Sequence, residues 1–448
     1  MGAIYSGRRS MSIVYFCSYR FTFLLTGSIP STIVNRMAEK RKKLLTISDA
    51  ISAQTGLGRI HRDIVTRIIE NLSDVYEVAT MGYGGVGTTK IKVPQLPAEG
   101  MVDWVLPTLP AVCSDFFGNE KATILTIWDA SRLTWLAAPR GCPELFTKFP
   151  GLQEWALSRP FELVGYIPID SSGPNDRLTF PIMRTLLGFD RLLAYGQFGE
   201  DVIRRTIGDE EADKRHLTHL PHGIDSSVFF ELPRKNTRKL FLQYTGARQF
   251  FELVGQQGAV TKPIADDEVL IGCVATNQQR KNWQIVAETI AILSRTHKVR
   301  CWAHTDDLER FWSLPNLFVD YGILDKTVIS LGAIRDDKMA TAYSACDLTL
   351  GPGDEGWGLP LGESLACGCP VIHGSYAGGS DVVPKEMQVD PVAFRYEGSY
   401  ASKRAVYNAS DWAAKAEEWI GKRASLDPKF EWGENWKSWE AYLREEAK

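Results

Sequence analysis

Short apolar runs alternate with longer polar segments along most of the chain. In the second half, runs of strand length occur at 269–274, 299–304 and 328–331, and the stretches between them suit helices. The same kind of run predicts further strands at 44–48, 77–81, 122–128, 162–168, 191–195 and 317–320. Strands that alternate with helices predict parallel, doubly wound sheets and therefore an α/β fold.

A strand, a glycine-rich loop and a helix follow one another within residues 348–383. Pro360 suits the first position of a helix, and Gly368 suits the position just after one. The loop before this helix has glycines at positions 351, 353, 356 and 358, and their lack of a Cβ lets backbone N–H groups approach a ligand. Because a helix N-terminus favours anions, the loop is a candidate diphosphate site.

Two glutamates belong to this unit. Glu355 lies in the loop and Glu363 on the helix eight positions later, so both side chains can border one pocket at the C-terminal edge of a sheet. Paired carboxylates accept hydrogen bonds, which suits the hydroxyl groups of a sugar better than phosphate. The alternative interpretation is an ordinary strand-loop-helix unit whose glutamates are solvated.

Two other turns carry residues that suit a phosphorylated ligand. Arg280 and Lys281 follow a predicted strand, where their charges can neutralise a leaving diphosphate; a solvated surface pair is the alternative. Gly56 and Gly58 follow the first predicted strand and precede a helix, which is a phosphate-friendly arrangement. A packing turn is the alternative for these two glycines.

Candidates for acceptor chemistry lie in the first half. Asp129 and Asp170 each follow a predicted strand, where strand ends open into a cleft, and Asp129 is the candidate that positions or deprotonates an acceptor, with a helix cap as the alternative. His216, His219 and His222 are spaced three apart, but apolar residues and a proline interrupt them, so no metal site is predicted.

The string from Glu355 to Glu363 contains Glu-Gly-Trp-Gly-Leu-Pro and is followed by Ala-Cys-Gly-Cys-Pro-Val. It resembles the signature of family 4 retaining glycosyltransferases, the glycosyl transferases group 1. The resemblance implies the GT-B fold: two Rossmann-like domains with doubly wound parallel sheets face a cleft, and a C-terminal helix returns to the first domain. The apolar face of that helix is expected from Trp432, Trp436, Trp439 and Leu443.

By this resemblance, Glu355 contacts the transferred sugar and Glu363 holds the ribose hydroxyl groups of the nucleotide. The candidate catalytic residues are Glu355, Lys281, Arg280 and Asp129. The candidate donor-binding residues are Gly56, Gly58, Gly356, Trp357, Gly358, Leu359 and Glu363.

Three positions depart from the family pattern. Many members carry a histidine near Asp129, and this chain has none there. An additional arginine of the family, a few residues before Arg280, is missing from this chain, which has Thr276 near that place. Asp381 stands where the family has a glutamate. The group that activates the acceptor is therefore left open.

The predicted organisation has five parts. They are an N-terminal extension (1–42), a Rossmann-like acceptor domain (43–225), a linker or insertion (226–266), a Rossmann-like donor domain (267–425) and a C-terminal crossing helix (426–448). Arg8, Arg9 and the apolar run 13–25 predict a signal peptide, a short anchor or a targeting segment, with a translation start at Met37 as the alternative. Deletion of residues 1–36 tests whether this part carries the protein to a membrane.

Composition narrows the function classes. The chain has 448 residues, 44% hydrophobic and 23% charged, with a formal net charge of -3, which fits a globular protein of two domains and gives no global attraction to nucleic acid. Its eight cysteines lack metal-ligand spacing, which favours reduced thiols and a cytoplasmic location. No Asp-x-Asp motif occurs, so neither a metal nor a cofactor is expected.

The expected function is retaining transfer of a hexose from a nucleotide-diphosphate sugar to an acceptor hydroxyl. The acceptor stays open between a glycan, a lipid and another small molecule, and so does a peripheral contact with a membrane through the early basic residues. Two rival functions remain: a GT-B phosphorylase or epimerase, and a non-catalytic nucleotide-sugar-binding subunit. The sequence does not name the sugar, the nucleotide or the oligomeric state.

Overall fold

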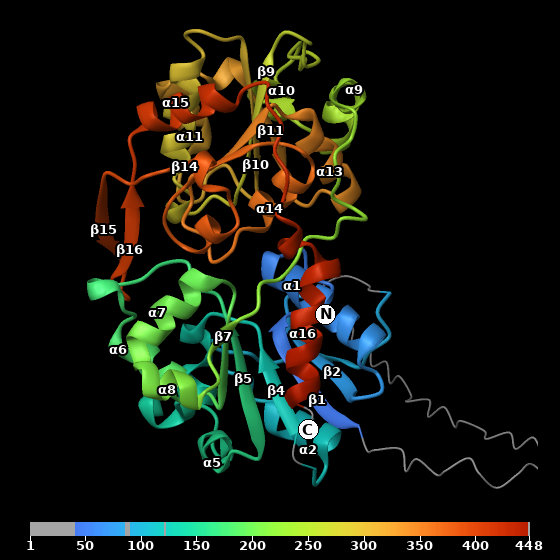
Figure 1. The fold of residues 1–448 in the computed structure, drawn as a ribbon, viewed down its shortest axis with the longest axis vertical. Coiled ribbons are helices and arrows are strands. Elements are labelled where there is room, and N and C mark those ends of the chain that lie inside the picture. Colours follow the sequence, from blue (N-terminus) through green and yellow to red (C-terminus); the bar gives the residue numbers. More distant parts are fainter. Residues whose placement is uncertain (1–40, 86–89, 121, 447–448) are drawn as a thin grey trace, which may run out of the picture. The chain divides into compact units, whose positions relative to one another are not determined.

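The computed structural model describes residues 41–85, 90–120 and 122–446. Nearly all of the predicted N-terminal extension, including Arg8, Arg9, the run 13–25 and Met37, lies outside the described residues. The described part contains two seven-stranded sheets and one two-stranded hairpin (Figure 1). All parts discussed below belong to the unit that begins at Arg41.

The first sheet is built from the first half of the chain, and all its strand pairs are parallel. The inner strand β1 (Lys42–Asp49) is buried over residues 44–49, as expected for a strand that is covered on both faces. In spatial order the strands are β3 (Gln95–Pro97), β2 (Tyr76–Tyr83), β1 (Lys42–Asp49), β4 (Ala122–Thr126), β5 (Phe161–Ile167), β6 (Arg191–Ala194) and β7 (Thr218–His219).

The second sheet is also parallel, except that β8 pairs antiparallel with β11. In spatial order its strands are β14 (Gln388–Val389), β13 (Val371–Gly374), β12 (Leu348–Gly351), β9 (Val269–Val274), β10 (Val299–Thr305), β11 (Thr327–Leu331) and β8 (Arg248–Gln249). The segment predicted as a linker or insertion therefore supplies an edge strand of this sheet. The two sheets confirm the predicted α/β fold of two Rossmann-like domains.

Helices connect the strands in both halves. They are α1 (Gly56–Asn71), α2 (Leu109–Phe117), α3 (Thr134–Ala137), α4 (Pro143–Phe146), α5 (Leu152–Ser158), α6 (Phe180–Leu187), α7 (Gln197–Ile207), α8 (Asp209–Lys214), α9 (Arg234–Thr245), α10 (Phe250–Leu253), α11 (Trp283–Leu293), α12 (Leu314–Asp320), α13 (Asp336–Ala345), α14 (Leu359–Ala366), α15 (Ala409–Trp419) and α16 (Trp432–Glu446).

Two features differ from the sequence prediction. The strand predicted at 317–320 is wrong, because these residues form the end of α12. Pro315 is the second residue of that helix, a position that favours a helix start, and a short apolar run cannot by itself separate a strand from a buried helix. The antiparallel hairpin of β15 (Ala393–Glu397) and β16 (Ser402–Val406) was not predicted.

The chain crosses between the two sheets twice, and the two crossings lie side by side. Ile224 N donates to Phe430 O at 2.8 Å, and Trp432 N donates to Ile224 O at 3.0 Å. A Cβ on Gly223 would lie 2.7 Å from the backbone nitrogen of Trp432, so only glycine permits this approach. Two long connections are thereby held in register at the point where the domains join.

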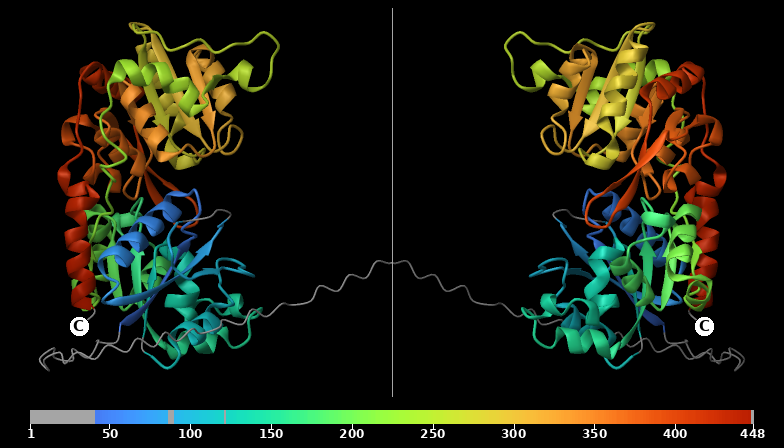
Figure 2. Two further views of the ribbon diagram at one scale, coloured as in Figure 1. Left: turned by 90° about the vertical axis from the view of Figure 1, so that its right-hand side faces the viewer. Right: turned by 90° about the vertical axis from the view of Figure 1, so that its left-hand side faces the viewer.

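The C-terminal helix α16 returns to the first sheet, as predicted. Tyr76 on β2 donates through its hydroxyl to Leu443 O at 2.7 Å, and the buried indole of Trp439 donates to Pro221 O at 2.9 Å. Figure 2 shows α16 along the side of the first domain, and it packs against α1. The aromatic face of this helix therefore serves packing.

Each sheet has a point where the strand order reverses. In the first sheet it lies between β1 and β4, and in the second between β9 and β12. Ligands of doubly wound sheets bind outside the C-terminal ends of strands at such points. The predicted site residues Gly56, Asp129, Lys281 and Glu355 all follow one of these four strands.

Candidate active site

Glu355, in the loop after β12, lies beside two basic residues from the turn after β9. Lys281 Nζ contacts Glu355 Oε1, and an Arg280 guanidinium nitrogen lies 3.3 Å from Glu355 Oε2. The same nitrogen of Arg280 donates to Asp354 O at 2.7 Å, which ties the loop to the turn. Because β9 and β12 pair directly, the two loops leave the sheet side by side. The structure thus brings three of the four predicted catalytic residues together.

Burial and charge act in opposite directions on Glu355. Burial would raise its pKa, but the charges of Lys281 and Arg280 and the hydrogen bond from Lys281 hold the pKa below its usual value. Glu355 is therefore ionised at neutral pH. An ionised carboxylate accepts hydrogen bonds from sugar hydroxyl groups, and the two cations beside it suit a diphosphate.

Glu363 is buried on α14 and is held by a residue of the first domain. Arg59 on α1 donates to Glu363 Oε1 at 2.5 Å, lies 3.9 Å from Asp336, and places its guanidinium over the ring of Phe229. Burial raises the pKa of Glu363, and the charge of Arg59 opposes this rise. The carboxylate predicted to hold ribose hydroxyl groups is thus already engaged across the two domains.

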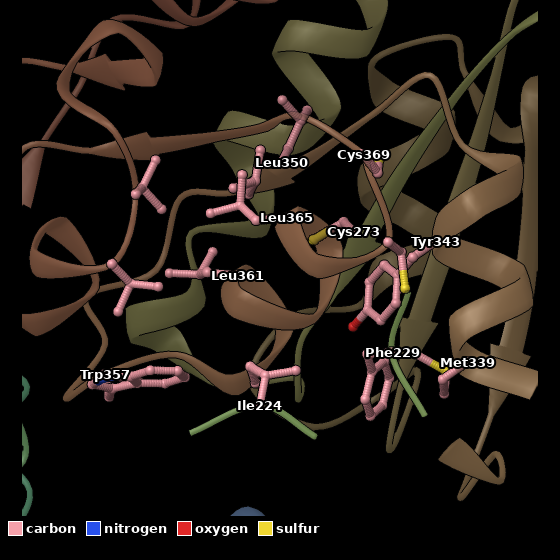
Figure 3. Packing of buried hydrophobic residues seen from close by; sticks show 14 of the residues in the cluster. Ile224, Phe229, Cys273, Met339, Tyr343, Leu350, Trp357, Leu361, Leu365 and Cys369 are labelled. Atoms are coloured by element: carbon pink, nitrogen blue, oxygen red, sulfur yellow. The ribbon is translucent and has the colours of Figure 1, made fainter. Parts of the chain in front are cut away.

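The turn between the two glutamates presents its backbone, because its one large side chain points into the core. The Trp357 side chain is 1% exposed and packs against the rings of His222 and Phe430, close to Ile224 (Figure 3). Gly358 has a φ of 92°, in the left-handed region that favours glycine, and directly precedes α14. Contact of this turn with a diphosphate stays a prediction, and the turn offers backbone N–H groups rather than the Trp357 side chain for it.

Gly356 and Leu359 complete the predicted turn. A Cβ on Gly356 would lie 3.3 Å from the side chain of Pro168, so the turn abuts the end of β5 in the first domain. Leu359 is the first residue of α14 and is half-buried. Gly379 N donates to Glu355 O at 3.2 Å, so a hydrogen bond joins the loop after β13 to the start of this turn.

Gly56 and Gly58 begin α1 at the reversal point of the first sheet. The N–H of Gly58 donates to Thr55 Oγ1 at 3.0 Å, which caps the helix. A Cβ on Gly58 would lie 2.8 Å from Ala50 O and 2.9 Å from Ala53 O, whereas one on Gly56 would meet open space. Gly58 therefore serves capping and packing here, and contact of either glycine with a donor diphosphate stays a prediction.

Asp129 and Asp170 line one cavity of about 120 Å³. Asp129 pairs with Arg132 at 3.4 Å, and about half of its side chain is exposed. Asp170 lies 3.3 Å from Arg280 and 3.4 Å from Arg404. These ion pairs connect Asp170, rather than Asp129, to the Glu355 cluster, and the role of Asp129 towards an acceptor stays a prediction.

The sequence analysis did not single out Arg59, Arg404 and Asp354, which surround the site. Arg59 is one of many charged residues on α1, and only its partner distinguishes it. Arg404 lies on β16, and its guanidinium is 3.7 Å from the carboxyl of Asp354, whose burial raises the pKa to about 8. Alternating residues around Gly398 were a signal for the hairpin, but nothing in them indicated these contacts.

A larger groove of about 910 Å³ lies between α7, β7 and the start of α16, and it contains none of the predicted site residues. Asp381, which stands where the family has a glutamate, lies at this groove and accepts a hydrogen bond from Phe198 N at 2.9 Å. His219 in its wall pairs with Glu200 at 2.7 Å. The predicted chemistry and this groove therefore occupy different places.

Two general features of the described ranges bear on function. Within 41–85, 90–120 and 122–446, no three histidine, cysteine, aspartate or glutamate side chains are grouped so that they could hold a metal ion. In the same ranges, no helix combines the length and apolar character needed to cross a bilayer.

Sequence comparison finds one family. Residues 268–402 match the family model described as Glycosyl transferases group 1, which covers most of the second sheet and reaches into the hairpin. No curated protein sequence matches the chain.

Solved structures share the fold over most of the chain. Sucrose-phosphate synthase from Thermosynechococcus elongatus has a TM-score of 0.59 at 13% identity, covering 91% of this chain and 100% of its own. Anabaena HepE in complex with UDP and glucose has a TM-score of 0.55 at 14% identity, with coverage of 84% and 88%. The catalytic domain of Starch Synthase IV from Arabidopsis thaliana, bound to ADP and acarbose, has a TM-score of 0.53 at 12% identity, with coverage of 90% and 99%. At such identities the likeness shows the fold, and it confirms the predicted GT-B architecture.

Proposed function

We propose that the chain is a glycosyltransferase of GT-B type, which is supported by the family match of the second domain and by the shared fold. In this proposal it transfers a hexose from a nucleotide-diphosphate sugar to an acceptor hydroxyl with retention of anomeric configuration. The second domain binds the donor, and the first domain presents the acceptor. Membership of family 4 is part of this proposal.

One observation carries the proposal: Glu355 lies with Lys281 and Arg280 at the reversal point of the second sheet. A carboxylate that accepts sugar hydroxyl groups thereby stands next to two cations that suit a diphosphate. Departure of the nucleotide places growing negative charge on its diphosphate, and preorganised cations stabilise that charge in the transition state. In this proposal the two basic residues replace a divalent metal, and no cofactor takes part.

Glu355 orients the transferred sugar in this mechanism. Its carboxylate is shared between Lys281 and Arg280, which lowers its power as a nucleophile, so hydrogen bonding to sugar hydroxyl groups is the better use. Stabilisation of the leaving diphosphate favours an oxocarbenium-like sugar. The acceptor hydroxyl then attacks the face from which the diphosphate leaves, and the configuration is retained.

Glu363 holds the ribose hydroxyl groups of the nucleotide in this proposal. Its partner Arg59 must share or leave the carboxylate when the nucleotide binds, because the two are in direct contact at 2.5 Å. Donor binding is thereby linked to the contact between α1 and α14. The proposed location is the cytoplasm, and peripheral membrane contact through residues 1–36 belongs to the same proposal.

The test is a thermal-shift series on the full chain with UDP-, GDP- and ADP-sugars, with and without magnesium, beside Glu363→Ala. A ligand that binds only the folded state raises the melting temperature. We expect one nucleotide-sugar to raise it, with no effect of magnesium and a smaller rise in the variant. NMR of the product should show the same anomer as the donor.

Other outcomes would redirect the proposal. No shift with any nucleotide-sugar, in protein shown to be folded, would contradict donor binding. Binding without turnover over many acceptors would favour a non-catalytic subunit. Turnover with inorganic phosphate as acceptor would indicate a phosphorylase, and conversion of the free nucleotide-sugar an epimerase.

A further inference from the structure

The β15–β16 hairpin extends from the second domain and has two different faces. Its register pairs Arg395 with Arg404 and Glu397 with Ser402, so these residues share one face, whereas Phe394 and Tyr396 lie on the other. Figure 1 shows the hairpin apart from both large sheets. Because an isolated two-stranded hairpin is marginally stable in water, contacts elsewhere must hold it in place.

Those contacts are made with the segment that follows β5 in the first domain. Lys403 N donates to Ser172 O at 2.7 Å, and Lys403 Nζ lies 2.6 Å from Asp176. The hydroxyl of Tyr376 accepts from Ser172 N at 3.0 Å and donates to Lys403 O at 3.1 Å. Arg404 donates to Asp170 O at 3.2 Å. The hairpin is thus fixed across the two domains at the edge of the active site.

Between the hairpin and this segment lies the cavity of about 120 Å³. At about 30 Å³ per water it has room for roughly four waters, which suits the end of one sugar ring rather than an extended chain. Leu178 and Ile182 make part of its wall apolar. Its polar wall includes the hydroxyl groups and carboxylates of Ser131, Ser171, Thr179, Ser402, Asp129 and Asp170.

The tip of the hairpin contributes an aromatic ring to this cavity. Tyr400 lines it and is 45% exposed. An exposed ring beside hydroxyl groups and carboxylates is suited to the apolar face and the hydroxyl edge of a sugar. The described residues that line the cavity include no lysine, arginine or histidine, so a negatively charged group would meet no cation in the wall.

The cavity adjoins the donor site. Asp170 lines the cavity and lies 3.3 Å from Arg280, which in turn contacts Glu355. Burial opposes ionisation of Asp170, but Arg280 and Arg404 lower its pKa, so it can accept a hydrogen bond from a hydroxyl group. A polyol held here would have its hydroxyl groups next to the site of transfer.

We propose that the β15–β16 hairpin selects the acceptor, and that Tyr400 and Ser402 close a pocket for an uncharged sugar unit. This inference rests on the proposed function, because it names the acceptor class of the same reaction. The described lining offers an anionic sugar no cation, and the arginines nearby are engaged by Asp129 and Asp170.

Direct binding tests the pocket without a donor. Saturation-transfer NMR on the full chain would use the methyl glycosides of glucose, galactose and mannose, with glucose 6-phosphate as the charged probe. We expect transfer to at least one neutral glycoside and a signal about fivefold weaker in Tyr400→Ala, because a stacking contact is lost. Ser402→Ala is a second variant for the same pocket.

Two matched variants serve as controls. Tyr400→Phe keeps the ring and should keep the signal. Tyr396→Ala removes a tyrosine that is 55% exposed on the opposite face of the hairpin, and it should also keep the signal. Melting temperatures of the unliganded variants show that each is folded.

Three results would overturn the inference: no transfer to any neutral glycoside, stronger binding of glucose 6-phosphate, or an equal loss in Tyr396→Ala and Tyr400→Ala. Donor binding is measured separately by thermal shift with the nucleotide-sugars. A protein that binds a donor but no glycoside contradicts this pocket alone, whereas one that binds glycosides but no donor contradicts the proposed transfer.

Discussion

Glu355 and Glu363 are eight positions apart and both belong to the same strand-loop-helix unit, yet their surroundings differ. Glu355 contacts Lys281 and Arg280, which come from its own domain. Glu363 contacts Arg59, which comes from the other domain and is 304 positions away in the chain. One carboxylate belongs to a local cluster, and the other to the contact between domains.

The charges of the two residues follow from this difference. The pKa of Glu355 is lowered because two cations outweigh its burial, whereas the pKa of Glu363 is raised because burial outweighs a single arginine. Glu355 can therefore act within one rigid domain. Glu363 depends on how the two domains meet, so a ligand at Glu363 can influence their contact.

The largest expected effect is that of Glu355→Gln on turnover. The substitution replaces a charged acceptor for sugar hydroxyl groups by a neutral amide and removes the ion-pair partner of Lys281. We expect kcat to fall about 10²–10³-fold, which is about 3–4 kcal/mol. The KM for the nucleotide-sugar should change by less than about threefold, because nucleotide contacts lie elsewhere. The measurement is steady-state transfer, with Glu363→Gln as the matched control. Equal, negligible losses in both variants would remove the site assignment.

A smaller effect is expected from Arg59→Met on stability. The variant removes the first-domain charge that stabilises the ionised, buried carboxylate of Glu363. We expect the free energy of unfolding at pH 8 to fall by about 2 kcal/mol, which is below the usual cost of breaking a fully buried ion pair. Chemical denaturation measures this. Arg67→Met on the same helix is the control for loss of an arginine, because Arg67 packs over the ring of Trp432 without contacting either glutamate.

The pH dependence of that loss gives its cause. The pKa of Glu363 is raised above the ordinary 4.5 in the folded protein, so its contribution to stability is complete below about pH 4.5 and is lost as the pH rises through the folded-state value. In Arg59→Met, burial raises the pKa of Glu363 further because no arginine opposes it, and more stability is lost as the pH rises. The difference between wild type and variant should therefore grow from pH 5 to pH 8. A difference that is independent of pH would mean that Arg59 stabilises through its packing on Phe229 instead.

The smallest expected effect is that of Glu363→Gln on nucleotide binding. A hydrogen bond to a charged group is replaced by one to a neutral amide, and we expect about tenfold weaker affinity, or about 1.4 kcal/mol. Calorimetry with the free nucleoside diphosphate measures this without turnover. Unchanged affinity in Glu363→Gln together with weaker affinity in Glu355→Gln would reverse the two assigned roles.

The glutamates could be predicted from the sequence because each is defined by its neighbours in the chain. Glycines, Pro360 and the apolar run before them determine where the strand ends and the helix begins, and these are local properties. Lys281 could be predicted for the same reason, since it follows an apolar strand. Glu355 and Lys281 then meet because the strands that precede them, β12 and β9, are neighbours in the sheet.

Arg59 and Arg404 show what could not be predicted in this way. Each acquires its importance from a partner in a distant part of the chain, and no local pattern records such a pair. The same holds for Trp357, which looked like a donor-binding residue but whose ring packs beside the crossing segment. Its burial depends on His222 and Phe430, which come from the two segments that cross between the domains.

The sequence by itself determined the alternating elements, the two α/β sheets and the edges at which the functional groups would lie, because apolar periodicity, glycine and proline act over a few residues. The tertiary structure decided which charges meet there: Asp170 rather than Asp129 joins the Glu355 cluster, and Arg59 rather than water holds Glu363. The physical reason is that the energy of an ion pair depends on separation and burial in space, which are set by the packing of the two domains and the hairpin and not by distance along the chain.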